Sequence, residues 1–269
     1  LWGRALQPQL GPEFHEAWDH GYVTVNRAFA DAVVEQLDAH PGATVFFHDY
    51  HLYLAPRMVR EARPDATLAH FVHVPWPTDW TVLPERLRHA VHDGLLANDV
   101  VGFHTARWAG NFEHSCREVC GGCETTVTHH AISIDVAEFE RLRTDEQVLA
   151  AEAALERPEK LVLRVDRTDP SKNIVRGCLA FRLLLDQHPE WRGRARLLAF
   201  LDPSRQTIPE YVDYLQAVEE VVSAVNARHP GAVQLRVADD FPQSVAAYKQ
   251  FDVLLVNAVY DGLNLVAKE

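Results

Sequence analysis

Short apolar runs alternate with amphipathic segments along almost the whole chain, and this alternation restricts the fold more than any other feature. The runs are ATVFFHD, TLAHFVHVP, DVVGFHT, LVLRVDR, ARLLAFLDP, VQLRVADD and FDVLLVNA. They are apolar nearly throughout, as is typical of parallel strands covered on both faces. The segments between them, such as NRAFADAVVEQLDAH, LPERLRHAVHDGLLA and NIVRGCLAFRLLLDQH, carry apolar residues at helical spacing. This alternation predicts an α/β fold with parallel sheets.

The alternation breaks once, near residues 136–160. The stretch VAEFERLRTDEQVLAAEAALERPEK is charged, rich in alanine and helical in pattern, and KLVLRVDR then begins a new series of strands. We therefore expect two incomplete α/β domains, residues 1–150 with a helical connection and residues 151–269. Two such domains are predicted to face each other across a cleft, the usual place for a ligand.

Length and charge narrow the class of protein. With 269 residues, 47% of them hydrophobic, the chain can form one large or two medium domains. Its net charge of −12 makes nucleic acids and anionic membranes poor candidates as partners. It has neither an apolar run of the roughly 20 residues that a membrane helix needs nor a signal peptide. We expect a cytoplasmic protein and, because the chain lacks an initiator Met and stops at Glu269, a fragment cut at both ends.

The cysteines allow two interpretations. Three of the four form a C-x3-C-x2-C pattern with histidines on either side. The residues are Cys116, Cys120 and Cys123, then Cys178 apart from them, with His114, His129 and His130 nearby. The pattern fits a small metal site or a cysteine-containing helix end before a Gly-Gly turn in a reducing compartment. No second cysteine pair follows at zinc-ribbon spacing, which favours the helix end.

Polar side chains follow five of the predicted strands directly. In open parallel sheets, ligands bind beyond the carboxyl ends of the strands. Each polar group alone fits turn chemistry or a helix cap, but five groups at equivalent strand ends predict one shared site. The groups are His48, Asp49 and His51; His73; Asp166, Arg167, Asp169 and Lys172; Asp202, Ser204 and Arg205; and Asp261, Asn264 and Glu269.

The basic residues among them suit phosphate. Arg167 offers a planar fork and Lys172 a point charge, and because they are five positions apart across a Pro-containing loop, both can point into one pocket and hold a diphosphate. Arg205 can hold another phosphate. No G-x-G-x-x-G, G-x-x-x-x-G-K-[ST] or G-x-S-x-G motif occurs, which argues against a dehydrogenase, a P-loop NTPase and an α/β-hydrolase. The final VYDGLNLVAKE predicts a strand, an Asp-Gly turn and a helix whose first N–H groups can bind an anion or a sugar hydroxyl.

Five motifs in this order carry a family resemblance: HDYHL, FVHVPWP, VDRTDPSKN, DPSR and DGLNLVAKE. Together they resemble the trehalose-6-phosphate synthase family, the retaining glycosyltransferases of family 20, over nearly the whole chain. The resemblance implies two facing Rossmann-like domains of the GT-B type. It also implies transfer of glucose from UDP-glucose or GDP-glucose to glucose 6-phosphate, giving α,α-trehalose 6-phosphate. The nucleotide sugar is then a substrate, no cofactor is implied, and the basic pair replaces a metal.

The resemblance also implies roles for single positions, with Glu269 on the ribose and Arg205 facing the sugar phosphate. Donor-binding roles are implied for Arg167, Lys172, Phe241, Asn264, Leu265, Val266, Ala267, Lys268 and Glu269. Acceptor-binding roles are implied for Trp2, Asp49 and Arg205. Catalytic roles are implied for Arg167, Lys172, His73 and Asp261.

The sequence departs from the family's usual motifs at three places. DPSKN stands for DYSKG, with Asn173 in place of Gly. AISI, Ala131–Ile134, stands for PIGI, and GRALQPQL, residues 3–10, replaces an aromatic segment that contains histidine. These departures leave open a cyclitol phosphate or another sugar phosphate as acceptor, or a non-catalytic module that binds a sugar phosphate. The sequence also leaves open the donor's base, a homo-oligomer, and whether this chain is active by itself.

Overall fold

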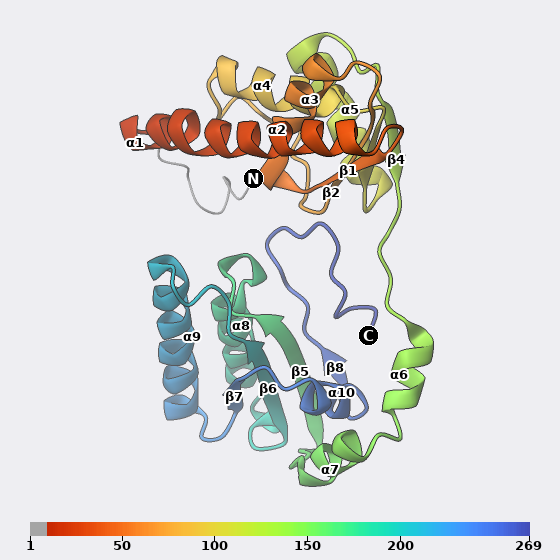
Figure 1. Ribbon diagram of the computed structural model, residues 1–269. Helices are drawn as coiled ribbons and strands as arrows, with labels where there is room; N and C mark the ends of the chain where they lie inside the picture. Colours follow the sequence, from red (N-terminus) through yellow and green to blue (C-terminus); the bar gives the residue numbers. More distant parts are fainter. Residues whose placement is uncertain (1–9) are drawn as a thin grey trace. The chain divides into compact units, whose positions relative to one another are not determined.

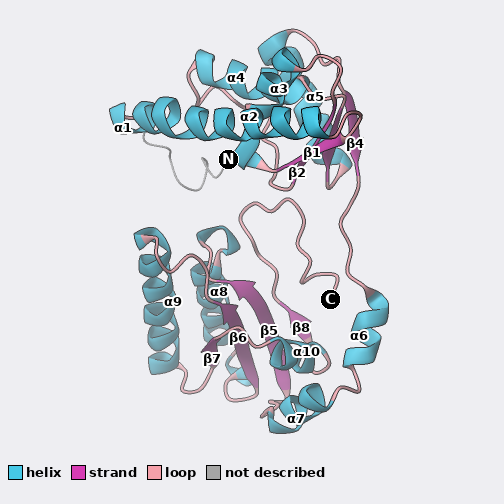
Figure 2. Ribbon diagram, viewed as in Figure 1, coloured by secondary structure: helices cyan, strands magenta, loops and turns pink. Residues whose placement is uncertain are grey.

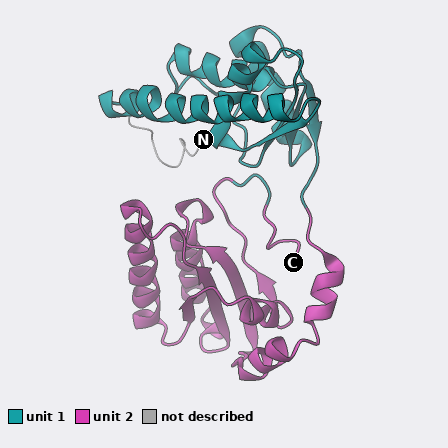
Figure 3. Ribbon diagram, viewed as in Figure 1, with its two compact units in different colours: residues 1–132, 261–263 teal, residues 133–260, 264–269 magenta. Residues whose placement is uncertain are grey.

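The computed structural model describes residues 10–269, which form two compact units (Figure 3). Unit 1 holds the chain up to Ile132 and residues Asp261–Leu263, and unit 2 holds the rest. The division therefore falls before the two helices α6 (Val136–Leu142) and α7 (Glu146–Ala154), whereas the sequence analysis drew the domain boundary after residue 150. These helices group with unit 2 because Val148 packs in one cluster with residues of a later helix, α10 (Phe241–Tyr248).

Unit 1 is a parallel sheet in which consecutive strands are neighbours. Its elements are α1 (Pro12–Glu16), a π-helical segment (Ala17–Tyr22), α2 (Val23–Ala39), β1 (Thr44–His48), a 3-10 turn (Tyr50–Leu52), α3 (Ala55–Ala62), β2 (Thr67–Val72), α4 (Glu85–Leu96), β3 (Val100–Phe103), α5 (Ala106–Cys120) and β4 (Thr126–His129). The strand order is β1-β2-β3-β4. Right-handed crossovers between neighbouring strands place the connecting helices on one face (Figure 1). Accordingly Leu68 and Val72 of β2 are buried, whereas Phe46, on the opposite face, is 55% exposed.

Unit 2 is a parallel sheet covered on both faces. Its remaining elements are β5 (Lys160–Arg167), a 3-10 turn (Pro170–Lys172), α8 (Ile174–Gln187), a second 3-10 turn (Pro189–Trp191), β6 (Ala195–Asp202), α9 (Pro209–Arg228), β7 (Val233–Val237) and β8 (Val253–Leu254). The strand order is β7-β6-β5-β8, so the chain reverses its direction of sheet growth at β5 (Figure 2). Leu197 packs with α8 and α9 on one face, and Leu198 packs with α10 on the other. A strand-order reversal of this kind is where open α/β sheets bind ligands.

Capping groups set the ends of several helices. Thr105 accepts a hydrogen bond from the backbone N–H of Trp108 (3.3 Å) and begins α5, and Asp240 accepts one from Gln243 (3.1 Å) and begins α10. Gly121 ends α5 at φ 78°, the left-handed conformation that glycine adopts most easily. These helices therefore begin and end where short polar side chains and glycine favour it.

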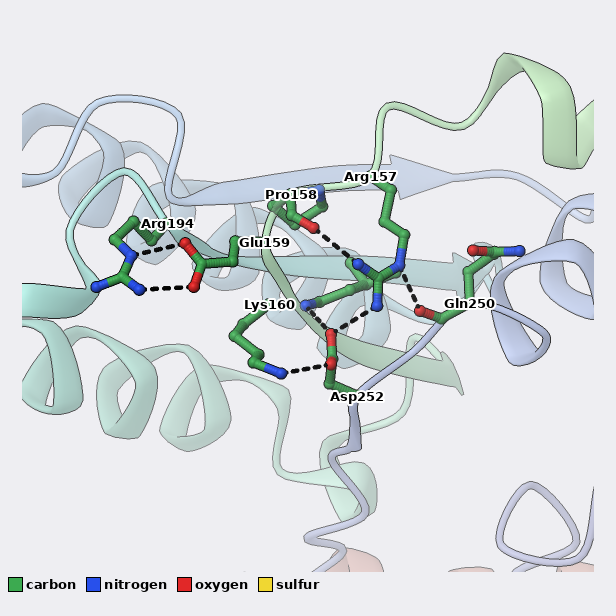
Figure 4. A network of polar contacts seen from close by, with 8 residues as sticks. Arg157, Pro158, Glu159, Lys160, Arg194, Gln250 and Asp252 are labelled. Atoms are coloured by element: carbon green, nitrogen blue, oxygen red, sulfur yellow. Dashed lines mark hydrogen bonds and ion pairs between the residues drawn. The ribbon is translucent and has the colours of Figure 1, made fainter.

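An ion-pair network holds the amino ends of β5 and β8 together (Figure 4). Asp252 pairs with Arg157 (3.1 Å) and Lys160 (2.9 Å), and it accepts a hydrogen bond from the backbone of Leu161 (2.8 Å). The backbone hydrogen bond and these cations lower the pKa of Asp252. The network therefore lies at the end of the sheet opposite to the carboxyl ends of the strands, where open α/β sheets bind ligands.

The structure differs from the sequence-based expectations in four elements. The strand β4 and the 20-residue helix α9 were not among the predicted segments, and the predicted strand over FDVLLVNA is confined to Val253–Leu254. The predicted helix after Gly262 is wrong as a regular element: residues 265–269 make a single turn, in which Glu269 N donates to Leu265 O (3.1 Å). Within residues 10–269, no helix has both the length and the apolar character needed to cross a membrane.

Candidate functional site

Asp49 ties the end of β1 to the loop that follows β2. Its carboxylate accepts hydrogen bonds from the backbone N–H groups of His73 (3.1 Å) and Val74 (3.3 Å), and its own N–H donates to Phe71 O (2.8 Å). Its backbone lies at φ 58° and ψ −173°, a region that residues with a Cβ atom rarely adopt. Such a conformation costs about 1–3 kcal/mol and typically marks a functional position.

Three histidines form a chain of imidazole contacts beside Asp49. His48 Nδ1 lies 3.2 Å from His73 Nε2, and His73 Nδ1 lies 3.2 Å from His104 Nε2. The backbone N–H of Ile132 points at His104 Nδ1 (3.5 Å), so that nitrogen is an acceptor. In neutral rings each remaining contact then has one direction: His104 Nε2–H donates to His73, and His73 Nε2–H donates to His48. The tautomers of the three rings are therefore coupled to one another.

Burial affects His73 and a fourth histidine, His70. It lowers the pKa of His73, an effect that Asp49 opposes and His48 increases. His70 lies behind them, donates from Nε2 to Asp49 O (3.0 Å), and is buried so that its pKa falls to about 4. A carboxylate beside imidazole rings offers acceptors and donors of the kind that bind sugar hydroxyls.

The segment Asp261–Leu263 belongs to unit 1, although its neighbours along the chain belong to unit 2. Trp108 Nε1 donates to Gly262 O (2.7 Å). A Cβ atom at Gly262 would lie 1.8 Å from the backbone oxygen of His73, so only glycine fits there. The structure therefore brings the segment that begins with Asp261 against the loop that carries His73.

In unit 2, charged groups gather at the carboxyl ends of the strands. Arg167 ends β5 and is exposed, and Asp202 ends β6. Burial raises the pKa of Asp202, Asp239 and Glu269 add to this, and Arg167 opposes it. Glu269 also accepts a hydrogen bond from the hydroxyl of Tyr248 (2.7 Å). Arg167, Asp202 and Glu269 therefore share one electrostatic environment.

The loop after β5 brings Lys172 to the amino end of α8. Asp169 begins the turn by accepting from Ser171 N (2.9 Å), and Ser171 O accepts from Val259 N (2.9 Å). Asn173 adopts the left-handed conformation (φ 60°, ψ 38°), and α8 starts at the next residue. The first backbone N–H of α8, that of Ile174, donates to the hydroxyl of Tyr214 (2.8 Å). Arg167, at the end of β5, and Lys172 therefore lie in the short connection that leads into α8.

Arg205 lies in the loop after β6, and Phe241 begins α10 in the connection after β7. Arg205 Nη1 donates to the hydroxyl of Tyr211 (2.7 Å), which in turn lies 3.4 Å from Asp169 Oδ2, so Arg205 is linked to the loop of Lys172. Phe241 is 48% exposed and makes an edge contact with Phe139 (6.1 Å between ring centroids). Asn264 Oδ1 accepts from Ala267 N (3.3 Å) and orders the turn that contains Leu265 to Glu269.

The structure thus divides the predicted site residues between the two units. Asp49, His73 and Asp261 lie in unit 1. Arg167, Lys172, Arg205, Phe241 and the segment 264–269 lie in unit 2, and Trp2 lies outside the described residues. The sequence analysis missed His104, Trp108, Arg164 and Asn257. Only His104 had a usable signal, because VGFHT also places a polar residue directly after a strand.

The cysteine pattern lies at the end of α5, with Cys120 directly before the left-handed Gly121. Burial raises the pKa of Cys116, and burial with Asp93 raises that of Cys120 to about 11, which keeps both as thiols. Within residues 10–269, no group of three His, Cys, Asp or Glu side chains has the geometry to hold a metal ion.

Comparison with known proteins identifies relatives along the whole chain. The sequence profile of glycosyltransferase family 20 matches residues 3–269. The trehalose-6-phosphate synthase of Mycolicibacterium gilvum is 34% identical over 298 residues, covering 100% of this chain and 59% of that protein. The validamine 7-phosphate valienyltransferase of Streptomyces hygroscopicus subsp. jinggangensis is 30% identical over 282 residues, covering 98% and 56%.

Among solved structures, a UDP-forming α,α-trehalose-phosphate synthase from Burkholderia xenovorans matches with a TM-score of 0.80 at 27% identity, covering 93% of this chain and 60% of that chain. The predicted GT-B-type α/β fold class is confirmed by this match. The chain spans less than two thirds of the length of each of these relatives.

Proposed function

The chain belongs to glycosyltransferase family 20, and we propose that the complete protein transfers glucose from UDP-glucose or GDP-glucose to glucose 6-phosphate with retention, giving α,α-trehalose 6-phosphate. One observation carries the proposal: Arg167 and Lys172 lie between the end of β5 and the start of α8 in a chain that matches the family from residue 3 to residue 269. Of the two donors we favour UDP-glucose, because relatives with this fold are described as UDP-forming.

The proposed mechanism follows from charge. Breaking the bond between the sugar and the diphosphate leaves negative charge on the departing phosphate oxygen. Arg167 and Lys172 stabilise that charge, and such preorganised stabilisation is often the largest catalytic term. The acceptor hydroxyl attacks from the face that the leaving group vacates, and the departing phosphate oxygen takes its proton.

Positioning accounts for much of the remaining rate. Asp49 and the neutral His73 bind hydroxyl groups of the sugars, with Asp261 near the donor glucose. Arg205 and Trp2 bind the acceptor, Arg205 through its phosphate. On the donor, Phe241 flanks the base, Asn264 contacts the glucose, and the turn from Leu265 to Glu269 holds the nucleotide with Glu269 on the ribose hydroxyls.

The partners in this proposal are a nucleotide sugar and a sugar phosphate, without a cofactor. We infer a cytoplasmic location from the four free cysteines, which fit a reducing compartment. Light scattering on the complete protein measures its oligomeric state.

Nucleotide release by the complete protein tests the function. It is assayed with UDP-glucose and with GDP-glucose, each with and without glucose 6-phosphate. Release that depends on glucose 6-phosphate supports the proposal and identifies the donor. If neither donor releases nucleotide with this acceptor, the proposed reaction is wrong.

The basic pair predicts that no metal is needed, because Arg167 and Lys172 offset the charge of the diphosphate. Activity in excess chelator is expected to equal activity without it. Loss of activity that magnesium restores would contradict this expectation.

A second acceptor class is favoured by particular positions. Asn173 and the segment Ala131–Ile134 depart from the family's usual motifs, and the valienyltransferase named above is 30% identical to this chain. A cyclitol phosphate is therefore the alternative acceptor. Mass spectrometry of the product distinguishes it from trehalose 6-phosphate. Saturable binding of donor without release with either acceptor supports a non-catalytic module instead.

A further inference from the structure

Arg164 lies in the middle of β5, and its side chain is fully buried. Its Nη2 pairs with Asp166 Oδ2 at 2.9 Å, and the Asp166 side chain is only 5% exposed. A buried guanidinium is costly to desolvate unless it is paired and its other N–H groups are hydrogen-bonded. Arg164 Nε is buried without a hydrogen-bond partner among residues 10–269, whereas Nη1 and Nη2 both have partners. Those partners show what this buried charge holds in place.

Those partners come from two loops at the carboxyl edge of the sheet. Arg164 Nη1 donates to Asn257 Oδ1 (2.5 Å), and Nη2 donates to the backbone oxygen of Lys172. The loops also bond to each other: Asn173 Nδ2 donates to Asn257 O (3.0 Å), and Asn257 Nδ2 donates to Asn173 O (3.3 Å). One guanidinium thus joins the central strand to the loop of Lys172 and to the segment after β8.

Gly177 and Asn173 leave room for the hydrogen bonds between Arg164, Asn257 and the loop of Lys172. A Cβ atom at Gly177, in the first turn of α8, would lie 2.5 Å from Arg164 Nη1 and 3.2 Å from Asn257 Oδ1. Asn173 occupies a left-handed position that glycine adopts most easily and asparagine tolerates. Asn173 keeps that backbone conformation and adds a side-chain hydrogen bond that glycine cannot make.

We propose that Arg164 is a positioning residue for nucleotide-sugar binding, and that Asn173 and Asn257 complete its network. Arg164 touches no substrate. It fixes the backbone of Lys172 and so directs the lysine ammonium toward the donor diphosphate. This inference rests on the proposed function. It assigns a role to the buried Arg164 and to Asn173, neither of which takes part in the proposed mechanism.

Two conservative variants of the complete protein test the network. Arg164→Lys keeps the positive charge beside Asp166 but loses the planar fork that reaches Lys172 O and Asn257. Asn173→Gly keeps the left-handed backbone and removes only the side-chain bond to Asn257. Arg196→Lys, on the neighbouring strand β6 and paired with the exposed Glu156 (3.7 Å), is the matched control.

The readouts are the Kd of UDP and of GDP by calorimetry, the KM values of donor and acceptor, and amide hydrogen exchange in residues 169–174. For whichever nucleotide the wild type binds, we expect Arg164→Lys to raise Kd and donor KM about tenfold or more, and Asn173→Gly about threefold. Exchange in the loop is expected to speed up in both variants. The acceptor KM and the control variant are expected to stay within about twofold of wild type.

The outcomes separate this inference from the proposed function. If both variants lower only thermal stability and leave Kd and loop exchange unchanged, Arg164 is merely structural and the proposal is wrong. If Arg164→Lys does not fold, Asn173→Gly decides alone. If the wild type binds UDP or GDP but transfers no sugar, the proposed function is wrong. The Kd values of the variants still test whether Arg164 and Asn173 position the nucleotide-binding loop. If the wild type binds neither nucleotide, both proposals fail.

Discussion

His70 shows how a single buried side chain ties the stability of unit 1 to pH. Its pKa is about 4 in the folded chain against about 6.5 in an unfolded one, so between these values the unfolded state binds a proton that the folded state does not. The contribution to stability is complete above pH 6.5 and is lost as the pH falls toward 4. We expect His70 alone to lower the free energy of unfolding by about 3 kcal/mol across this window.

Urea denaturation at pH 7 and pH 4.5 checks this expectation against His70→Gln. Glutamine can still donate to Asp49 O but does not titrate. The variant is expected to lose clearly less stability than the wild type on acidification. Equal losses in both proteins would show that other groups carry the pH dependence.

Arg167 and Lys172 are the residues on which the proposed mechanism depends most. Removing either donor from the departing diphosphate is expected to lower turnover by about 10²–10³-fold. Initial rates of nucleotide release by Arg167→Ala and Lys172→Ala check this. Lys160→Ala is the control, because Lys160 lies at the opposite end of the same strand and pairs with Asp252. Near-normal rates in both site variants would refute the assigned roles.

At the scale of elements, the position of α4 depends on one glycine. A Cβ atom at Gly94 would lie 1.9 Å from the backbone oxygen of Tyr53, and backbone cannot move aside as a flexible side chain can. Gly94→Ala is therefore expected to destabilise unit 1 by about 3 kcal/mol.

Gly110, in the exposed face of α5, provides the matched substitution. A Cβ atom at Gly110 would meet no other atom within 4 Å among residues 10–269. Gly110→Ala is expected to stabilise the helix by about 0.5–1 kcal/mol, since alanine is the better helix former. Denaturant titration of both variants measures the difference. Similar effects in the two would contradict the proposed packing of α4.

The elements that the sequence predicts best are those with a strong local pattern. The predicted strand LVLRVDR corresponds to β5, and the predicted helix NIVRGCLAFRLLLDQH corresponds to α8. Both were predictable because a buried strand and an amphipathic helix each have a recognisable spacing of apolar residues. The strand β4 (TVTH) has three polar positions in four and carries no such signal. The turn after Asn264 looked helical from composition, but its hydrogen bonds close one turn only.

Some residues of the candidate site were likewise predictable from the sequence, and others were not. The positions of Asp49, His73 and Arg167 at strand ends were predictable, because each follows or ends an apolar run. The contact between Trp108 and Gly262 was not, because it joins residues 154 positions apart. The sequence shows Arg164 only as a charged residue within an apolar run. Its partners, Asn257 and the backbone oxygen of Lys172, lie in loops whose positions the sequence does not predict.

At the scale of the whole molecule, the chain passes from unit 2 into unit 1 for three residues, Asp261–Leu263, and then returns. Two features of unit 1 hold this segment: the hydrogen bond from Trp108 and the close approach of Gly262 to His73 O. Under the proposed function, this segment carries Asp261 to the transferred sugar, so its seating on unit 1 controls the chemistry.

Gly262→Ala is therefore expected to displace the segment, since its Cβ atom would meet a backbone oxygen at 1.8 Å. Sugar transfer is expected to fall by about a hundredfold or more, because misplacing a reacting group by about 1 Å has that effect. Hydrogen exchange in residues 259–264 is expected to speed up, while exchange in the helices of both units stays at wild-type rates. Trp108→Phe removes only the hydrogen bond and is expected to give a smaller change in the same direction. Wild-type exchange and transfer in Gly262→Ala would show that the segment is seated by contacts other than these two.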